Sequence, residues 1–262
     1  MTAKFPALLA GFSVFAFAAA GRAATDAGGP EDFRIEIMGS AWIVDSSGTI
    51  QSGTTPVDIV SDLGAEQRQP AFFGSIAFKP TPRQEIVVEG MPLSIQGRNT
   101  VQRSVMYHGQ TFFVNQTLHS SASLNYLFAG YQYDFLSGRA GDLGVSAGGA
   151  YLSATGTIHA IEAGTSATKS ETLGLPLAGV AFRLFPIPGR RWIEVEGGMR
   201  GMSFGGYGSY LQAEASGGIG FGPIAFLAGY REIHADLHST GTAGSGVNLR
   251  LRGPIFSMQW CW

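Results

Sequence analysis

Apolar and polar residues alternate along much of this chain, which predicts β-strands with one apolar and one polar face. In one such segment, Ile193, Val195 and Met199 fall on one face, whereas Glu194 and Arg200 fall on the other. Alternation of this kind occurs in membrane barrels, and also in soluble barrels or sandwiches whose apolar face points inward. The pattern therefore predicts an all-β fold, and other features must decide where its apolar face points.

The alternating segments predict about ten strands, several of them about ten residues long or longer, as strands that cross a membrane at a tilt must be. The predicted strands are 32–46, 70–79, 84–96, 117–135, 141–157, 171–186, 191–204, 207–219, 222–237 and 247–262. This number and length of strands favour a transmembrane antiparallel up-and-down β-barrel.

The predicted connections alternate between short and long, as periplasmic turns and extracellular loops do in such a barrel. The short ones are 79–83, 137–141, 186–190 and 220–223, and the longer ones are 47–69, 97–116, 158–170 and 238–246. The connection Gly205–Gly208 is short where a long loop is expected, so about eight strands is the alternative count. Segment 84–135 reads as one long hairpin whose tip projects beyond the membrane as a surface contact element.

The last predicted strand places Phe256, Met258, Trp260 and Trp262 on one face. It resembles the final strand of bacterial outer-membrane barrels, which serves as the membrane insertion signal read by the barrel assembly machinery. The resemblance implies location in the outer membrane of a Gram-negative cell, with lipid and lipopolysaccharide as neighbours.

Residues 1–24 have the features of a secretory signal peptide, with Lys4, an apolar run over 5–20 and small residues near Ala20 and Ala23. The apolar run is shorter than the ~20 residues of a membrane helix. Because Cys261 is the sole cysteine, neither a lipid anchor near the cleavage site nor an intramolecular disulfide is expected. We therefore expect a signal peptide at 1–24 and an outer-membrane barrel domain at 25–262.

Composition agrees with a membrane barrel and argues against several other classes. Charged residues make up 14% of the 262 residues, and there are 38 glycines, whereas soluble proteins average about 25% charged residues. Beyond the first segment there is no apolar run of ~20 residues, which excludes helical spans. The net charge of -2 gives no reason to expect binding to nucleic acid.

The polar faces of the predicted strands carry acids and bases in similar numbers. The residues expected to line the lumen are Arg34, Glu36, Glu89, Arg183, Glu194, Glu196, Arg200, Glu214 and Glu232. The lumen of a small barrel is filled by side chains, and charges buried there need partners. The sequence thus predicts a salt-bridge network that closes the lumen. Bulges are predicted at Pro176 and at Gly253-Pro254, because proline cannot donate to a strand ladder.

A candidate rim cluster consists of His234, Asp236 and His238, which alternate near the outer end of a predicted strand and share one face. Such a cluster can be compared with the rim sites of barrel proteases and lipid A deacylases, but the other motifs of those enzymes are missing. Alternating histidines can also bind a metal. We favour polar rim residues without chemistry, and expect no cofactor.

Several short motifs, in their order along the chain, resemble those of small outer-membrane barrels of the general OmpA-like and OmpW-like design. They are Val57-Asp-Ile-Val-Ser-Asp-Leu-Gly64, Phe78-Lys-Pro-Thr-Pro-Arg83, Gly109-Gln-Thr-Phe-Phe113, Gly130-Tyr-Gln-Tyr-Asp134, Gly229-Tyr-Arg231 and Leu251-Arg-Gly-Pro254. The resemblance implies the barrel fold and no particular chemistry. The expected function is a non-catalytic structural or surface-interaction role with a narrow or plugged lumen. The alternatives are a narrow porin for small solutes and a rim enzyme acting on lipid A or peptides.

Overall fold

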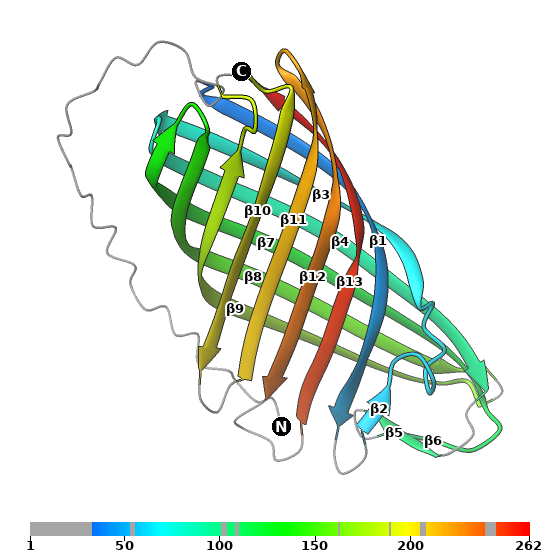
Figure 1. The fold of residues 1–262 in the computed structure, drawn as a ribbon. Coiled ribbons are helices and arrows are strands. Elements are labelled where there is room, and N and C mark those ends of the chain that lie inside the picture. Colours follow the sequence, from blue (N-terminus) through cyan, green and yellow to red (C-terminus); the bar gives the residue numbers. More distant parts are fainter. Residues whose placement is uncertain are drawn as a thin grey trace.

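Ten long strands form one closed antiparallel barrel (Figure 1). The computed structural model describes residues 33–52, 56–100, 104–107, 110–161, 163–188, 190–204, 208–238 and 245–262. The wall strands are β1 (Ile35–Ser52), β3 (Arg68–Thr81), β4 (Gln84–Thr100), β7 (Thr117–Gly138), β8 (Gly141–Ala160), β9 (Thr165–Leu184), β10 (Ile193–Phe204), β11 (Gly208–Phe221), β12 (Ile224–His238) and β13 (Ser245–Cys261). Pairing of β13 with β1 closes the barrel, so the alternative count of eight strands is wrong. The predicted signal peptide lies outside the described residues.

The two ends of the barrel differ as predicted. At the periplasmic end, residues 82–83, 139–140, 185–192 and 222–223 connect the strands. The extracellular end carries β2 (Pro56–Asp58) and the hairpin of β5 (Val105–Tyr107) and β6 (Gln110–Phe112), opposite the C-terminus in Figure 1. The predicted loop 158–170 is mostly strand, because β8 and β9 continue to residues 160 and 165. In the described part of the chain, no helix is long and apolar enough to cross a membrane.

The prolines do not produce the predicted bulges. Pairing of β8 with β9 continues through Gly149 and Pro176 without a change of register. The ladder between β9 and β10 ends instead at Ala178 and Gly201, before Pro176 is reached. Proline lacks an N–H, so Pro176 itself has no backbone donor to pair with β10 beyond this point.

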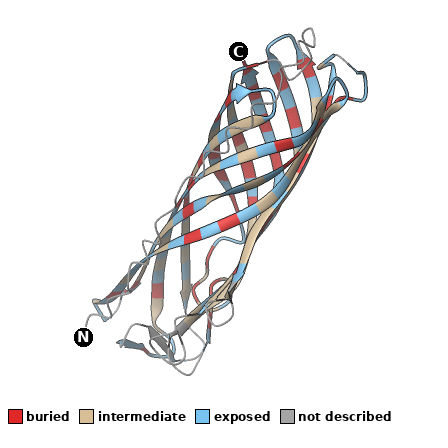
Figure 2. Cartoon of the chain, turned by 90° about the vertical axis from the view of Figure 1, so that its left-hand side faces the viewer, coloured by how far each residue is buried: buried red, intermediate tan, exposed pale blue. Residues whose placement is uncertain are grey.

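The outward side chains of the periplasmic half form a broad apolar belt. Figure 2 shows the alternation of buried and exposed positions along the strands. Large exposed side chains of this belt include Leu127, Tyr131, Val145, Leu184, Ile193, Met199, Ile219, Phe226, Phe256, Met258, Trp260 and Trp262. So large an apolar surface is costly in water and favourable in lipid. The belt is therefore the lipid-facing surface, and it includes the predicted terminal aromatic residues.

The chemical character of the two faces reverses near the outer boundary of this belt. On β13, Phe256 and Met258 point outward while Ser257 and Gln259 are buried. Toward the extracellular end of the same strand, Arg250 and Arg252 point outward and Leu251 is buried. The alternation is continuous across Gly253-Pro254, and the pairing with β12 has no register shift there. In the sequence, apolar residues switch from Leu249 and Leu251 to the opposite parity at Phe256, which suggested a bulge. The switch instead marks the point where β13 passes from water into the membrane.

The same reversal occurs on neighbouring strands. On β12, the exposed aromatic residues Phe226 and Tyr230 give way to outward Glu232, whereas buried Arg231 gives way to buried Ile233. The charged side chains of the lumen therefore lie at membrane level, and the inward residues above them are mainly apolar. The outward face of the wall is apolar at membrane level and polar above it.

Candidate functional site

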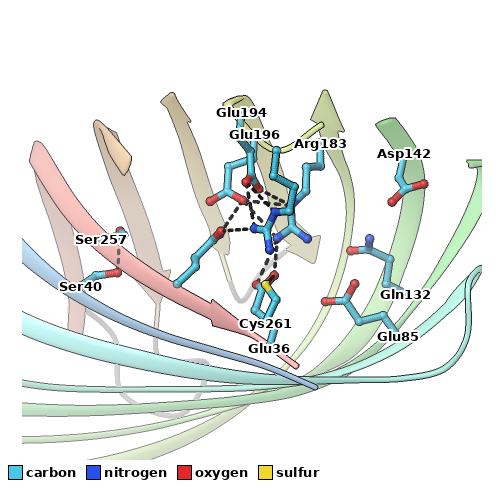
Figure 3. Close-up of polar contacts among 12 residues, drawn as sticks. Glu36, Ser40, Glu85, Gln132, Asp142, Arg183, Glu194, Glu196, Ser257 and Cys261 are labelled. Carbon is cyan, nitrogen blue, oxygen red and sulfur yellow. Dashed lines mark hydrogen bonds and ion pairs between the residues drawn. The ribbon is translucent and has the colours of Figure 1, made fainter. Parts of the chain in front are cut away.

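A charged cluster, which we call the lower layer, crosses the lumen at the periplasmic end. Arg183 lies at its centre, with its guanidinium 2.9 Å from Glu36, 3.0 Å from Glu194 and 3.2 Å from Glu196. Arg191 donates to the same Glu194 at 2.9 Å. Figure 3 shows Glu36 of β1, Arg183 of β9 and Glu196 of β10 pointing toward one another, so the cluster connects strands on opposite sides of the barrel.

Further residues complete the lower layer. Lys79 lies 3.7 Å from Glu85 and 3.6 Å from Asp142. The buried ring of Phe33 lies beneath the cations of Lys79, at 4.6 Å from the ring centroid, and Arg183, at 5.6 Å. Sequence reasoning missed Lys79, Glu85, Asp142 and Arg191. They lie close to the predicted turns, where alternation is too short to assign a face.

A second cluster, the upper layer, crosses the lumen nearer its middle. The fully buried Arg231 pairs with Glu89 and, at 3.1 Å, with Glu214, and Arg200 also pairs with Glu89. Both arginines lie over aromatic rings, with Arg231 4.2 Å from the centroid of Phe73. Because Glu89 stands on β4 and its partners on β10 and β12, these pairs connect opposite sides of the barrel.

Aromatic and amide side chains close the outer side of the upper layer. The Tyr126 and Tyr210 rings are stacked with centroids 6.5 Å apart. Their hydroxyls each lie 3.2 Å from the Gln212 side-chain amide. Between the upper and lower layers is a cavity of about 170 Å³. The lumen is thus crossed twice by paired charges.

Most of the predicted lumenal charges lie in these layers, and two do not. Glu36, Arg183, Glu194 and Glu196 are in the lower layer, and Glu89, Arg200 and Glu214 are in the upper layer. Arg34 is exposed, because the chain reaches the barrel through Phe33, which points inward in its place. Glu232 points outward and pairs with Arg250 at 2.7 Å, since its neighbour Arg231 occupies the inward position.

The predicted rim cluster lies on the outward face of β12. Asp236 and His238 are 3.5 Å apart, and both are partly exposed. The residues paired with His234 are Leu211 and Arg250, so its cross-strand neighbours supply no carboxylate. Among the described residues, no group of three or more His, Cys, Asp or Glu side chains is placed to hold a metal.

Above the upper layer, the lumen widens into an apolar cavity of about 340 Å³, which we call the outer chamber. The stacked Tyr126 and Tyr210 form its floor. Its apolar walls include Met91, Leu93, Ile95, Leu124, Leu152, Leu173, Ile233, Ala235, Leu237, Leu249 and Leu251. The chamber is therefore built from inward faces of most of the long strands. No single segment of the sequence contains it.

Residues 56–65 fold over the outer chamber as a cap. Val57 and Leu63 are buried against Leu118 and Ile158 of the wall, together with Phe112 of β6. Ile59, Leu63 and Ala65 line the chamber from above. The Ser120 hydroxyl donates to the Leu63 carbonyl at 2.7 Å, which ties the cap to β7. The motif singled out at Val57–Gly64 in the sequence is therefore a cover for the extracellular mouth.

One glycine is required for the cap to fold this way. Gly64 has φ of +67°, a left-handed conformation that other residues adopt at a cost. A Cβ atom on Gly64 would lie 2.5 Å from the Arg98 carbonyl oxygen of β4. The backbone of the cap therefore packs directly against the backbone of β4, and a side chain at Gly64 would not fit between them.

Comparison with known proteins supports the fold and leaves the function open. Neither family models nor curated proteins give a match. Among solved structures, the outer membrane protease OmpT of Escherichia coli is similar, with a TM-score of 0.60, 9% identity, and coverage of 87% of this chain and 97% of that chain. Ail of Yersinia pestis (TM-score 0.37, 8% identity, coverage 86% and 99%) and OprG of Pseudomonas aeruginosa (0.40, 10%, 88% and 96%) are further barrels with similarity.

The barrel and its apolar belt together establish where the protein resides. A closed antiparallel barrel satisfies the backbone in lipid, and the outward faces are apolar at membrane depth. The protein is an outer-membrane β-barrel. At 9% identity, the similarity to OmpT concerns the fold and does not extend to proteolysis.

Proposed function

We propose that the protein is a closed, non-catalytic outer-membrane barrel that acts in binding at the cell surface. The observation that carries this proposal is the pair of charged layers below an outward-facing chamber. Glu36 and Arg183 connect β1 with β9, and Glu89 and Arg231 connect β4 with β12, so ion pairs bridge the lumen at two levels. Conduction would require these buried pairs to separate, which is costly in a low-dielectric interior.

The extracellular end supplies the surface for this role. Beside the cap, Phe113 and Val114 are exposed, at 61% and 46% of their surface. They follow β6 in the connection between β4 and β7 that was predicted as the contact element. Exposed apolar residues on a surface loop favour contact with a partner. The outward rim cluster, in contrast, offers no arrangement of acids that supports an enzymatic function.

Conductance tests the closed lumen. Residues 25–262, refolded and inserted in planar bilayers, are expected to show no stable open steps, with heat-modifiable gel mobility as evidence of folding. A double variant, Arg183→Ala with Arg231→Ala, removes a central cation from each layer and is expected to show open steps or frequent transient openings. Stable steps of reproducible size in the unmodified protein would contradict the proposal and assign it to the porins.

A further inference from the structure

We propose that the outer chamber binds one unbranched hydrocarbon chain, such as the acyl chain of a fatty acid or a lipid. The proposal deepens the surface-binding role above and rests on it, but it does not depend on a closed lumen. Its basis is the position, lining and shape of the chamber.

The position of the chamber is unusual for so apolar a space. Inward Leu93, Leu152 and Leu173 line it, whereas their outward neighbours Ser94, Ser153 and Thr172 are polar. The outward face of the wall is in water at this level, so the apolar residues of the chamber do not serve to contact membrane lipid. Apolar cavities of this kind do not hold water well and bind apolar molecules instead. An empty chamber would also leave its lining without van der Waals partners.

The shape of the chamber favours a chain over a compact molecule. Its lining runs on β8 from Leu152 to Ile158 and on β7 from Ser120 to Tyr126. Six residue steps of a strand span roughly 20 Å. A volume of about 340 Å³ drawn out along such a wall is long and narrow. This volume also lies near the lower end of ligand pockets, which is about 300 Å³.

The two ends of the chamber match an amphipathic molecule. The floor is formed by the stacked tyrosine rings, with the upper layer beneath them. At the outer end, Lys169 and Glu171 contribute to the lining, and both side chains are partly exposed. A hydrocarbon tail can therefore lie along the leucine-rich wall while a polar end group remains among charged side chains in water.

The wall also has a seam near the outer leaflet. The last residues paired between β9 and β10 are Ala178 and Gly201, so Leu173–Leu177 of β9 lie beyond this ladder. At this level the outward face of β9 changes from apolar Val180 to polar Thr172, which marks the membrane boundary. A chain could thus come from the outer leaflet through the seam or from the medium past the cap. The chemistry of the bound chain is the same in both cases.

Photolabelling can separate occupation of the chamber from ordinary lipid contact. The protein in nanodiscs is exposed either to a phospholipid with a diazirine in its acyl chain or to a free diazirine fatty acid of about twelve carbons. After irradiation, mass spectrometry locates the labels. We expect labels on inward Leu152, Leu173 and Ile233 in at least one arm, and the arm that gives them identifies the source of the chain.

A matched pair of variants on β12 makes the result specific. Ala235→Phe fills the chamber and is expected to reduce inward labelling at least fivefold, whereas Ala228→Phe adds the same ring to the outward face and leaves it unchanged. Gel mobility checks that both variants are folded. Labels confined to outward residues such as Leu127 and Phe226 in both arms would overturn the proposal. Equal labelling by a compact adamantane diazirine would overturn its preference for a chain. Conductance of the unmodified protein tests the closed lumen separately.

Discussion

Removal of residues 260–262 is expected to reduce the amount of assembled barrel at least tenfold. These residues complete the pairing between β13 and β1, where Trp260 lies opposite Ile37 and Cys261 opposite Glu36. The backbone of Trp262 also exchanges hydrogen bonds of 2.8 Å with Ile35. Without them, the periplasmic ends of β1 and β12 lose their partners, and unpaired backbone groups are costly at membrane depth. Heat-modifiable mobility of the protein in isolated outer membranes measures the effect.

A variant that removes an aromatic ring elsewhere provides the control. Trp192 is exposed near the periplasmic end but takes no part in the pairing of β13 with β1. Trp192→Ala should assemble at close to the unmodified level. If the truncated chain also inserted normally, the terminal strand would not be the insertion signal predicted from Phe256, Met258, Trp260 and Trp262.

Arg231→Met is expected to lower the free energy of unfolding by about 3–5 kcal/mol, the cost of breaking a buried ion pair by removing one partner. Arg231 is fully buried and pairs with both Glu89 and Glu214. Methionine fills part of the space but leaves Glu214 without its cation. Denaturant unfolding in lipid vesicles, followed by tryptophan fluorescence, gives the change.

An outward ion pair between β12 and β13 provides a comparison. Arg250 lies 2.7 Å from Glu232, with side-chain exposures of 45% and 35%. Arg250→Met should cost less than about 1 kcal/mol, because exposed ion pairs contribute little. Similar losses in the two variants would show that the upper layer contributes no more than a surface pair, which would contradict a lumen held closed by its ion pairs.

Sequence patterns were sufficient for the strands and for much of the polar lumen. Alternation around Glu194, Glu196 and Arg200 assigns those residues to the inward face because neighbouring apolar residues on β10 face lipid. The rule fails where the chain leaves the membrane. On β13, Leu249 and Leu251 point inward just as Ser257 and Gln259 do, although they are apolar. In the sequence, this change of residue type looks like a change of face, and therefore like a bulge.

The outer chamber could not be predicted for a different reason. Its lining comes from β1, β4, β7, β8, β9, β11, β12 and β13, and each contributes only a few apolar residues. Their convergence depends on the pairing register and on the cap, which are properties of the closed barrel. The motif Val57–Gly64 was noticeable in the sequence, but its role requires knowing that Leu118 and Ile158 lie beneath it.

The reversal of the faces also makes the barrel sensitive to bilayer thickness. Above Tyr151 on β8 the outward residues are Ser153, Thr155 and Thr157, so a thicker hydrocarbon core would have to cover hydroxyl groups. Tilting offers limited relief, because inclining the barrel immerses one side as it raises the other. Mismatch costs fractions of a kcal/mol per ångström and is enough to sort proteins among membranes. The protein should therefore partition toward bilayers whose thickness matches its belt.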